Sequence, residues 1–326
     1  MNNWLITGGC GFIGAALTRK LRAQGENVKI VDNLATGDLS GLPEVACVVE
    51  PESTRDVRVG QWSGMDVIVA DIRASDIAVV AAKGADVVVH LAANTGVIPS
   101  IEDPLLDRTV NVDGTFNYLD AARHRNVQRF VFASSGAVLG PQTPPLHENL
   151  PSRPISPYGA SKLAGEAYCS AYYGAYGLKT VALRFGNVYG PGSHHKNSVV
   201  AKFIKQALAG KTLAVYGDGN QTRDFIYIED IVDAIYRAAT VPGLGGDVFQ
   251  IATQREHTVL EVLALIRAEL KQARGIDIRA THEPERAGEV RRNFSDVSHA
   301  KAKLGFAPAV ELPEGIRLTV KSFLSN

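Results

Sequence analysis

Trp4-Leu5-Ile6-Thr7-Gly8-Gly9-Cys10-Gly11-Phe12-Ile13-Gly14 decides the fold of this chain. A short apolar strand runs into a glycine-rich turn, and a helix is expected from Phe12 onward. Gly8 permits the tight turn, Gly11 lets the backbone approach a phosphate, and Gly14 lets helix and strand pack closely. The helix N-terminus supplies free N–H groups and a positive dipole end. The stretch predicts a turn that receives a dinucleotide pyrophosphate, although an ordinary glycine-rich turn would share its pattern.

The second predicted strand, Val28–Asp32, supports the dinucleotide interpretation. Asp32 lies eighteen residues after Gly14, where a carboxylate can accept hydrogen bonds from ribose hydroxyls and would repel a 2′-phosphate. No arginine occurs in the following turn, residues 33–37. These features favour NAD over NADP, with a capping role for Asp32 at the strand end as the alternative.

The third predicted strand, Asp66–Ala70, is followed by Asp71 and Ile72. There the Asp71 carboxylate would accept from the adenine amino group, and Ile72 would pack on the ring. Asp71 could equally be the N-cap of the next helix. Both interpretations remain open at this point.

Strands and helices alternate through the first half of the chain, which predicts an α/β fold with a Rossmann-type, doubly wound parallel sheet. Residues 1–190 are expected to form this NAD-binding domain, and residues 191–326 a smaller domain that covers the substrate. The strand Val248–Ile251 is expected to return to the main sheet, so the two domains partly interleave. Residues 41–64 lack clear periodicity and are expected to form an irregular surface excursion. Further strands are predicted at Ala85–Leu91, Arg129–Ala133 and Thr180–Arg184, and helices at Phe12–Gln24, Ala74–Lys83, Pro104–Arg125 and Tyr158–Tyr176.

Composition excludes several classes of protein. The chain has 326 residues, 45% hydrophobic, with 34 basic and 34 acidic side chains, so no basic surplus points to nucleic acid or an anionic membrane. Three scattered cysteines form neither a metal-binding spacing nor a disulfide framework, which favours the cytoplasm. We expect no signal peptide and no membrane span.

Tyr158 and Lys162 are the candidate catalytic pair. Four residues on a helix are about one turn, so the phenol and the ammonium emerge on one face. An ammonium ~6 Å away, at an effective dielectric constant of ~20, would lower the pKa of Tyr158 by about 2 from its usual value of about 10. Ser135 lies at the carboxyl end of the predicted strand of residues 129–133, in a position to hydrogen-bond the reacting oxygen, whereas Ser134 is interpreted as the start of a loop.

Eight motifs are spread along nearly the whole chain, and together they resemble the extended short-chain dehydrogenase/reductase family, in particular its nucleotide-sugar epimerases. Besides the glycine-rich turn they are His90-Leu91-Ala92-Ala93, Asn111-Val112-Asp113-Gly114-Thr115, Ser134-Ser135-Gly136-Ala137-Val138, Tyr158-Gly159-Ala160-Ser161-Lys162, Arg184-Phe185-Gly186-Asn187-Val188-Tyr189-Gly190-Pro191, Tyr216-Gly217-Asp218-Gly219-Asn220-Gln221-Thr222-Arg223-Asp224-Phe225-Ile226 and Arg286-Ala287-Gly288-Glu289-Val290.

The resemblance implies a catalytic set of Ser135, Tyr158 and Lys162, no metal, and a homodimer paired through helices 104–125 and 157–177. It implies that NAD is bound by Gly8, Gly11, Phe12, Ile13, Gly14, Asp32, Asn33, Thr36, Gly37, Asp71, Ile72, Leu91, Ala92, Ala93, Asn111, Tyr158, Lys162 and Phe185. It implies that the nucleotide sugar is bound by Ser135, Asn187, Val200, Tyr216, Arg223, Arg286 and Asn293, the two arginines clamping the diphosphate.

Three departures from the family pattern bear on the substrate. Gly136-Ala137 replaces the acidic residue that sugar dehydratases and decarboxylases carry after the catalytic hydroxyl. Asn293 stands where some hexose-restricted epimerases carry a bulky Tyr, which leaves room for a 2-acetamido group. The basic loop Ser193–Lys196 could meet a uronate carboxylate or a phosphate, although a solvated loop is favoured.

The resemblance therefore implies an NAD-dependent C4 epimerase acting through a 4-keto intermediate on a UDP-hexose or UDP-N-acetylhexosamine. The alternatives are a UDP-glucuronate 4-epimerase, a reductase of a nucleotide-linked keto sugar, or an NAD-sensing protein without catalysis.

Overall fold

The computed structural model describes residues 1–57, 60–62, 64–285 and 290–325. The chain divides into two units, each assembled from three segments. Unit 1 comprises Met1–Gln142, Glu148–Phe185 and Val232–Phe249, and unit 2 comprises Thr143–His147, Gly186–Ile231 and Gln250–Asn326.

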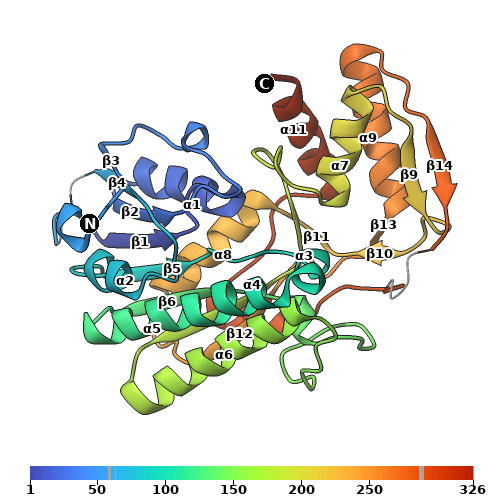
Figure 1. Ribbon diagram of the computed structural model, residues 1–326. Coiled ribbons are helices and arrows are strands. Elements are labelled where there is room, and N and C mark those ends of the chain that lie inside the picture. The colour runs from blue at the N-terminus through green and yellow to red at the C-terminus, as the bar shows by residue number, and fades with distance from the viewer. Residues whose placement is uncertain (58–59, 63, 286–289, 326) are drawn as a thin grey trace. The chain divides into compact units, whose positions relative to one another are not determined.

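An eight-stranded sheet runs in the order β12-β7-β6-β5-β1-β2-β4-β3, and its pairs from β3 to β7 are parallel (Figure 1). This confirms the predicted Rossmann-type sheet. The strand order reverses between β1 and β5, so the turn after β1 lies at the topological switch point where such sheets place ligands. The strands are β1 (Asn3–Thr7), β2 (Asn27–Asp32), β3 (Cys47–Val49), β4 (Met65–Val69), β5 (Val87–His90), β6 (Arg129–Ser135), β7 (Thr180–Phe185) and β12 (Asp247–Ile251).

Helices cover both faces of this sheet because its strands are apolar on both sides. On one face, Leu5, Val88 and Phe130 share a core cluster with residues of α2 (Ser75–Ala81), α5 (Gly114–His124) and α6 (Pro157–Tyr176). On the other face, Trp4 of β1 stacks on Tyr236 of α8 (Ile228–Thr240) with ring centroids 5.9 Å apart. Helix α1 (Phe12–Ala23) adjoins α8 there through a Lys20–Asp233 ion pair.

Two sequence expectations need correction. The region of residues 41–64 is not wholly irregular, because β3 pairs in parallel with β4 and extends the sheet edge. The helix expected over 104–125 contains a π-helical segment, Thr109–Asp113, between α4 (Pro104–Arg108) and α5. The structure adds the short helix α3 (Val97–Glu102) before it. A π turn widens the helix by one residue and does not disturb apolar periodicity enough to be seen in a sequence.

Unit 2 is built from short elements. Its parallel pairs are β8 (Asn187–Tyr189) with β11 (Phe225–Tyr227) and β9 (Leu213–Tyr216) with β14 (Ala280–Glu283), and β10 (Thr222–Arg223) runs antiparallel to β13 (His257–Thr258). Its helices, apart from the start of α8, are α7 (Val199–Leu208), α9 (Val259–Arg274), α10 (Ser298–Leu304) and α11 (Leu312–Ser325). Within the described part of the chain, no helix combines the length and apolarity needed to cross a membrane.

Candidate active site

The glycine-rich turn is built by close backbone approaches that only glycine allows. Gly8 has φ +71°, and a Cβ there would lie 2.7 Å from the Ala92 nitrogen. A Cβ on Gly14 would lie 2.2 Å from the Gly8 carbonyl oxygen, and one on Gly37 would lie 2.2 Å from that of Cys10. Strand, turn and helix therefore pack without side chains between them, as a backbone cradle requires.

The N-terminus of α1 opens from this turn. Gly11 is the N-cap and provides no side-chain hydrogen bond to the first turn. The helix therefore offers backbone N–H donors and its positive dipole end to a phosphate. Phe12 and Ile13, which follow the cap, are half-buried. These features fit the dinucleotide that the sequence predicts.

Asp32 ties the end of β2 to the glycine-rich turn. Its Oδ2 accepts from the Cys10 N–H at 2.9 Å, and its Oδ1 accepts from the Leu34 N–H at 2.8 Å. Burial raises the pKa of this carboxyl group, while the two N–H donors oppose that rise. The carboxylate is thus fixed beside the turn. Thr36, which follows it in the same loop, is exposed.

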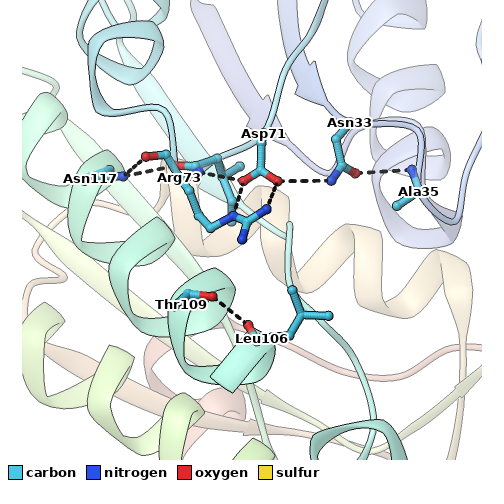
Figure 2. Close-up of polar contacts among 8 residues, drawn as sticks. Asn33, Ala35, Asp71, Arg73, Leu106, Thr109 and Asn117 are labelled. Atoms are coloured by element: carbon cyan, nitrogen blue, oxygen red, sulfur yellow. Dashed lines mark hydrogen bonds and ion pairs between the residues drawn. The ribbon is translucent and has the colours of Figure 1, made fainter. Parts of the chain in front are cut away.

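Asp71 lies between Asn33 and Arg73 in a polar network (Figure 2). It accepts from Nε and Nη2 of Arg73 at 2.9 and 2.8 Å and from the Arg73 backbone N–H at 2.8 Å. The Asn33 amide approaches it at 3.5 Å. Hydrogen bonding from the Arg73 side chain lowers the pKa of Asp71 and keeps it ionised.

The start of α2 bears on one of the two roles considered for Asp71. Helix α2 begins at Ser75 with Ala74 as its N-cap, so the N-cap interpretation is wrong. Ile72 is only 5% exposed. Its side chain packs so closely against Gly114 that it occupies the space a Cβ atom at Gly114 would need. Arg73 was missed by sequence reasoning, because a bidentate pair between residues two apart leaves no periodic signal.

The segment after β5 carries Leu91, Ala92 and Ala93, all half-buried. Asn111, from the π-helical segment, holds the next residue in place: its Oδ1 accepts from the Asn94 N–H at 2.7 Å, and its Nδ2 lies 3.0 Å from the Asn94 carbonyl oxygen. The same Nδ2 is 3.1 Å from the Ser161 hydroxyl of α6. Asn111 thereby braces this loop against the helix that carries Tyr158.

Ser135, Tyr158 and Lys162 come together in unit 1. Ser135 ends β6 and hydrogen-bonds Tyr158. Lys162 Nζ lies 5.9 Å from the centroid of the Tyr158 ring and donates to the Ala133 carbonyl at 2.9 Å. Phe185 ends β7, the neighbouring strand, opposite Ser135. The distances suit a phenol held between a hydroxyl and a cation.

Gly159 permits this assembly. A Cβ at this position would lie 2.5 Å from the Ala137 carbonyl oxygen, so the start of α6 can approach the turn after β6 only with glycine here. Ser156 caps the helix by accepting from the Gly159 N–H at 3.1 Å, and Pro157 occupies the first turn.

The electrostatics of the pair differ from the sequence expectation. Burial raises the pKa of Tyr158, Ser135 opposes the rise, and the Asp107 carboxylate adds to it. Burial also lowers the pKa of Lys162 to about 8. The predicted fall in the Tyr158 pKa is therefore wrong for the chain by itself, because water is withdrawn from the phenolate and the ammonium together.

A buried network beside the site was also missed. Ser134, only 4% exposed, does not start a loop: its hydroxyl donates to Glu166 Oε1 at 2.5 Å. Glu166 in turn accepts two hydrogen bonds from Arg184, at 2.8 and 2.7 Å. This network joins β6, α6 and β7 immediately behind Ser135.

The predicted sugar-nucleotide residues lie in unit 2. Asn187 is exposed on β8, Val200 is 1% exposed on α7, and Tyr216 is half-buried at the end of β9, 5.5 Å from Lys202 Nζ. Asn293 is half-buried. Arg286 lies outside the described residues.

Arg223 is held by backbone carbonyls, since its Nη1 donates to Thr222 and Val290 at 2.7 Å each. The adjacent Asp224 is 1% exposed and accepts from the Thr253 N–H and hydroxyl, at 2.7 and 2.6 Å, and from the Gln254 N–H at 3.0 Å. Sequence reasoning gave Asp224 no role. Its contacts show that it fixes the loop after β12 beside Arg223.

The loop Ser193–Lys196 is not simply solvated. Ser193 is 1% exposed and donates to the Gly190 carbonyl at 2.7 Å. The His194 ring lies 4.1 Å from that of Phe323, and burial lowers its pKa. Most of this loop is therefore anchored within unit 2.

Comparison with known proteins gives consistent results. The model of the NAD dependent epimerase/dehydratase family matches residues 4–252. A UDP-glucose 4-epimerase of Mycolicibacterium smegmatis is 36% identical over 98% of this chain and 97% of its own length. The Thermus thermophilus UDP-glucose 4-epimerase in complex with NAD has a TM-score of 0.84 and 36% identity, over 99% of both chains. The UDP-N-acetylglucosamine 4-epimerase from Methanobrevibacter ruminantium, in complex with UDP-N-acetylmuramic acid, has a TM-score of 0.87 and 31% identity, over 99% of this chain and 98% of that one.

Proposed function

Because the chain belongs to the NAD dependent epimerase/dehydratase family, we propose that it is a nucleotide-sugar 4-epimerase acting on a UDP-hexose or UDP-N-acetylhexosamine. Its cofactor is NAD. The observation that carries the proposal is the assembly of Ser135, Tyr158 and Lys162 at the carboxyl end of β6, in the same unit as the glycine-rich turn.

Tyr158 is the base that removes the proton of the sugar 4-hydroxyl, with Ser135 hydrogen-bonded to it and to the reacting oxygen. Lys162 stabilises the phenolate by its charge and holds the nicotinamide ribose. NAD, when bound, would supply the hydride acceptor and donor for C4. The 4-keto sugar must present its opposite face in between, and Tyr158 then reprotonates the oxygen.

The turn after Ser135 favours epimerisation over dehydration. Elimination of the 6-hydroxyl needs a proton donor near the sugar, and Gly136-Ala137 offers neither an acid nor a base there. Asn293 leaves room for a 2-acetamido group that a bulky aromatic residue would fill. We assign Asn187, Val200, Tyr216, Arg223, Arg286 and Asn293 to the nucleotide sugar.

We also propose a homodimer. Helices α4, α5 and α6 expose Leu105, Phe116, Tyr168 and Tyr176 at 66, 40, 39 and 57%. Phe116 and Tyr168 meet edge-to-face with centroids 5.6 Å apart, so these two rings form one apolar surface, which a second copy would cover. Sedimentation should show a dimer, and Phe116→Glu should produce a monomer.

The three cysteines, all free thiols in the structure, support a reducing cytoplasmic location.

The test is product analysis by NMR after incubation with UDP-glucose, UDP-N-acetylglucosamine, UDP-glucuronate and dTDP-glucose. We expect 4-epimers of the first two, no 6-deoxy-4-keto product, and no net change in NADH absorbance. Steady NADH consumption with a keto sugar would instead establish a reductase. The absence of any product with the whole panel would leave the non-catalytic alternative.

A further inference from the structure

Asp107 is a buried carboxylate that the proposed mechanism does not use. It lies in the last turn of α4 and is 1% exposed. Its Oδ1 accepts from Asn111 Nδ2 at 2.9 Å. Its Oδ2 is also buried, and the Ser161 side chain hydrogen-bonds the carboxyl group. A buried carboxylate is costly, so its presence calls for a compensating charge.

The compensating charge is on α6. The same Asn111 Nδ2 that donates to Asp107 lies 3.1 Å from the Ser161 hydroxyl, and Ser161 directly precedes Lys162. Asp107 interacts electrostatically with both Lys162 and Tyr158. Burial raises the pKa of Asp107, while Ser161 and the Lys162 charge oppose that rise. The Asp107 carboxylate is thus linked to the helix that carries Tyr158 and Lys162 through the side chains of Asn111 and Ser161.

The π-helical segment between α4 and α5 contributes the contact that fixes this chain. It contains Asn111, four residues after Asp107, and gives its side-chain amide three neighbours: Asp107, Asn94 and Ser161. Single π turns occur preferentially at functional sites, because they reorient one side chain at a cost in helix stability.

We propose that Asp107 is a positioning residue of the epimerase, whose buried carboxylate keeps Lys162 charged beside Tyr158. This role rests on the proposed function of the Tyr158–Lys162 pair. Burial lowers the pKa of Lys162 to about 8, and Asp107 opposes that fall. Without Asp107, Lys162 would lose its proton at a lower pH, so the pH range in which its charge is present beside Tyr158 would end lower.

Other charged groups near α4 do not substitute for Asp107. Glu102 of α3 is exposed, and Asp113 of the π-helical segment pairs with Arg108 at 3.5 Å near the surface. His90, on β5, is neutral, since burial and the Lys162 charge lower its pKa to about 3. Tyr158 and Lys162 are therefore the groups whose ionisation should respond.

The test is Asp107→Asn, which keeps an oxygen for Asn111 and removes the charge. The pH profile of kcat should move to lower pH by roughly one unit, because the Asp107 charge raises the pKa of both Tyr158 and Lys162 and its removal lowers both. Asp66→Asn is the matched control: this carboxylate is 6% exposed in the same unit and interacts with Lys29. Its profile should equal that of the wild type.

A second readout does not depend on turnover. The phenolate absorbance that Tyr158→Phe removes gives the titration of Tyr158 directly, and it should also shift to lower pH in Asp107→Asn. If the wild type epimerises no sugar of the panel, this titration still tests the role of Asp107. A failure of the proposed epimerase function can therefore be told apart from a failure of the Asp107 proposal. Unchanged profiles and an unchanged phenolate titration in Asp107→Asn would refute the proposal.

Asp107→Asn could unfold because it leaves the Lys162 charge unpaired. In that case the double variant Asp107→Asn/Lys162→Met decides between the two explanations. If the double variant folds, the charges of Asp107 and Lys162 are coupled. If it stays unfolded, Asp107 is needed only for folding, and the proposal is overturned.

Discussion

Arg184 Nη2 lies 2.7 Å from Glu166 Oε2, and both side chains are at most 5% exposed. The pair crosses from β7 to α6 and also receives the Ser134 hydroxyl. Two charges this deeply buried stabilise the fold only as a pair, since each alone carries an uncompensated desolvation cost.

Glu166→Gln should therefore lower the free energy of unfolding by about 3 kcal/mol, because it leaves the Arg184 guanidinium buried without its counter-charge. Guanidinium unfolding measures the loss. The matched control is Glu314→Gln, whose partner Arg317 forms an exposed pair at 2.6 Å. That change should cost less than about 1 kcal/mol. Equal losses at the two positions would contradict this account.

Tyr158→Phe keeps the aromatic ring and removes the group that takes the proton. We expect kcat to fall by ~10²–10⁴ while NAD remains bound. Turnover by NMR and cofactor content by absorbance of the denatured protein measure the two effects. Near wild-type turnover would show that another residue is the base.

Asp32 should make the protein prefer NAD over NADP. The Asp32 carboxylate is held in place by two backbone N–H groups. If the ribose binds beside it as the sequence predicts, it repels a 2′-phosphate, and we expect NADP to bind at least about 10-fold more weakly in calorimetry. Asp32→Asn retains a hydrogen-bond acceptor and should narrow the difference. Equal affinities in the wild type would mean that Asp32 only supports the turn.

Asn293→Tyr should discriminate among substrates. If the small side chain leaves space beside C2, the bulky one overfills it and costs ~1–3 kcal/mol for UDP-N-acetylglucosamine. That corresponds to roughly 5–150-fold in kcat/KM. UDP-glucose and UDP-glucuronate should lose less. Equal losses on the three substrates would show that position 293 is not a gate.

Lys162→Met should abolish activity and remove the pH dependence of stability that the buried ammonium causes. The pKa of Lys162 is about 8 in the folded chain against 10.5 normally, so the folded state binds fewer protons between these values, and wild-type stability rises with pH across that window. From pH 7 to pH 10.5 the wild type should therefore gain as much as about 3 kcal/mol relative to the variant, whereas the cost of leaving Asp107 without its counter-charge does not depend on the Lys162 titration. A difference in stability between wild type and variant that does not change with pH would contradict this pKa.

The sequence by itself determined the sheet, the glycine-rich turn and the proximity of Tyr158 and Lys162 on one helix. Strand alternation, a turn that only glycine can make and a four-residue helical spacing are local properties, and local properties can be read from residue order. The segments around Gly8, Asp32 and Ser135 each carry such a signal, and parallel topology brings the carboxyl ends of their strands to one edge of the sheet.

Only the tertiary structure decided the electrostatics. Asp107 lies 55 residues from Lys162 in the chain, and Arg184 lies 18 from Glu166. Neither coupling has a spacing signature. The direction of the Tyr158 pKa follows from how much water the folded chain removes from each group, which opposed the simple expectation from the Lys162 charge. Desolvation and long-range charge coupling depend on the packed environment, so residue order alone does not specify them.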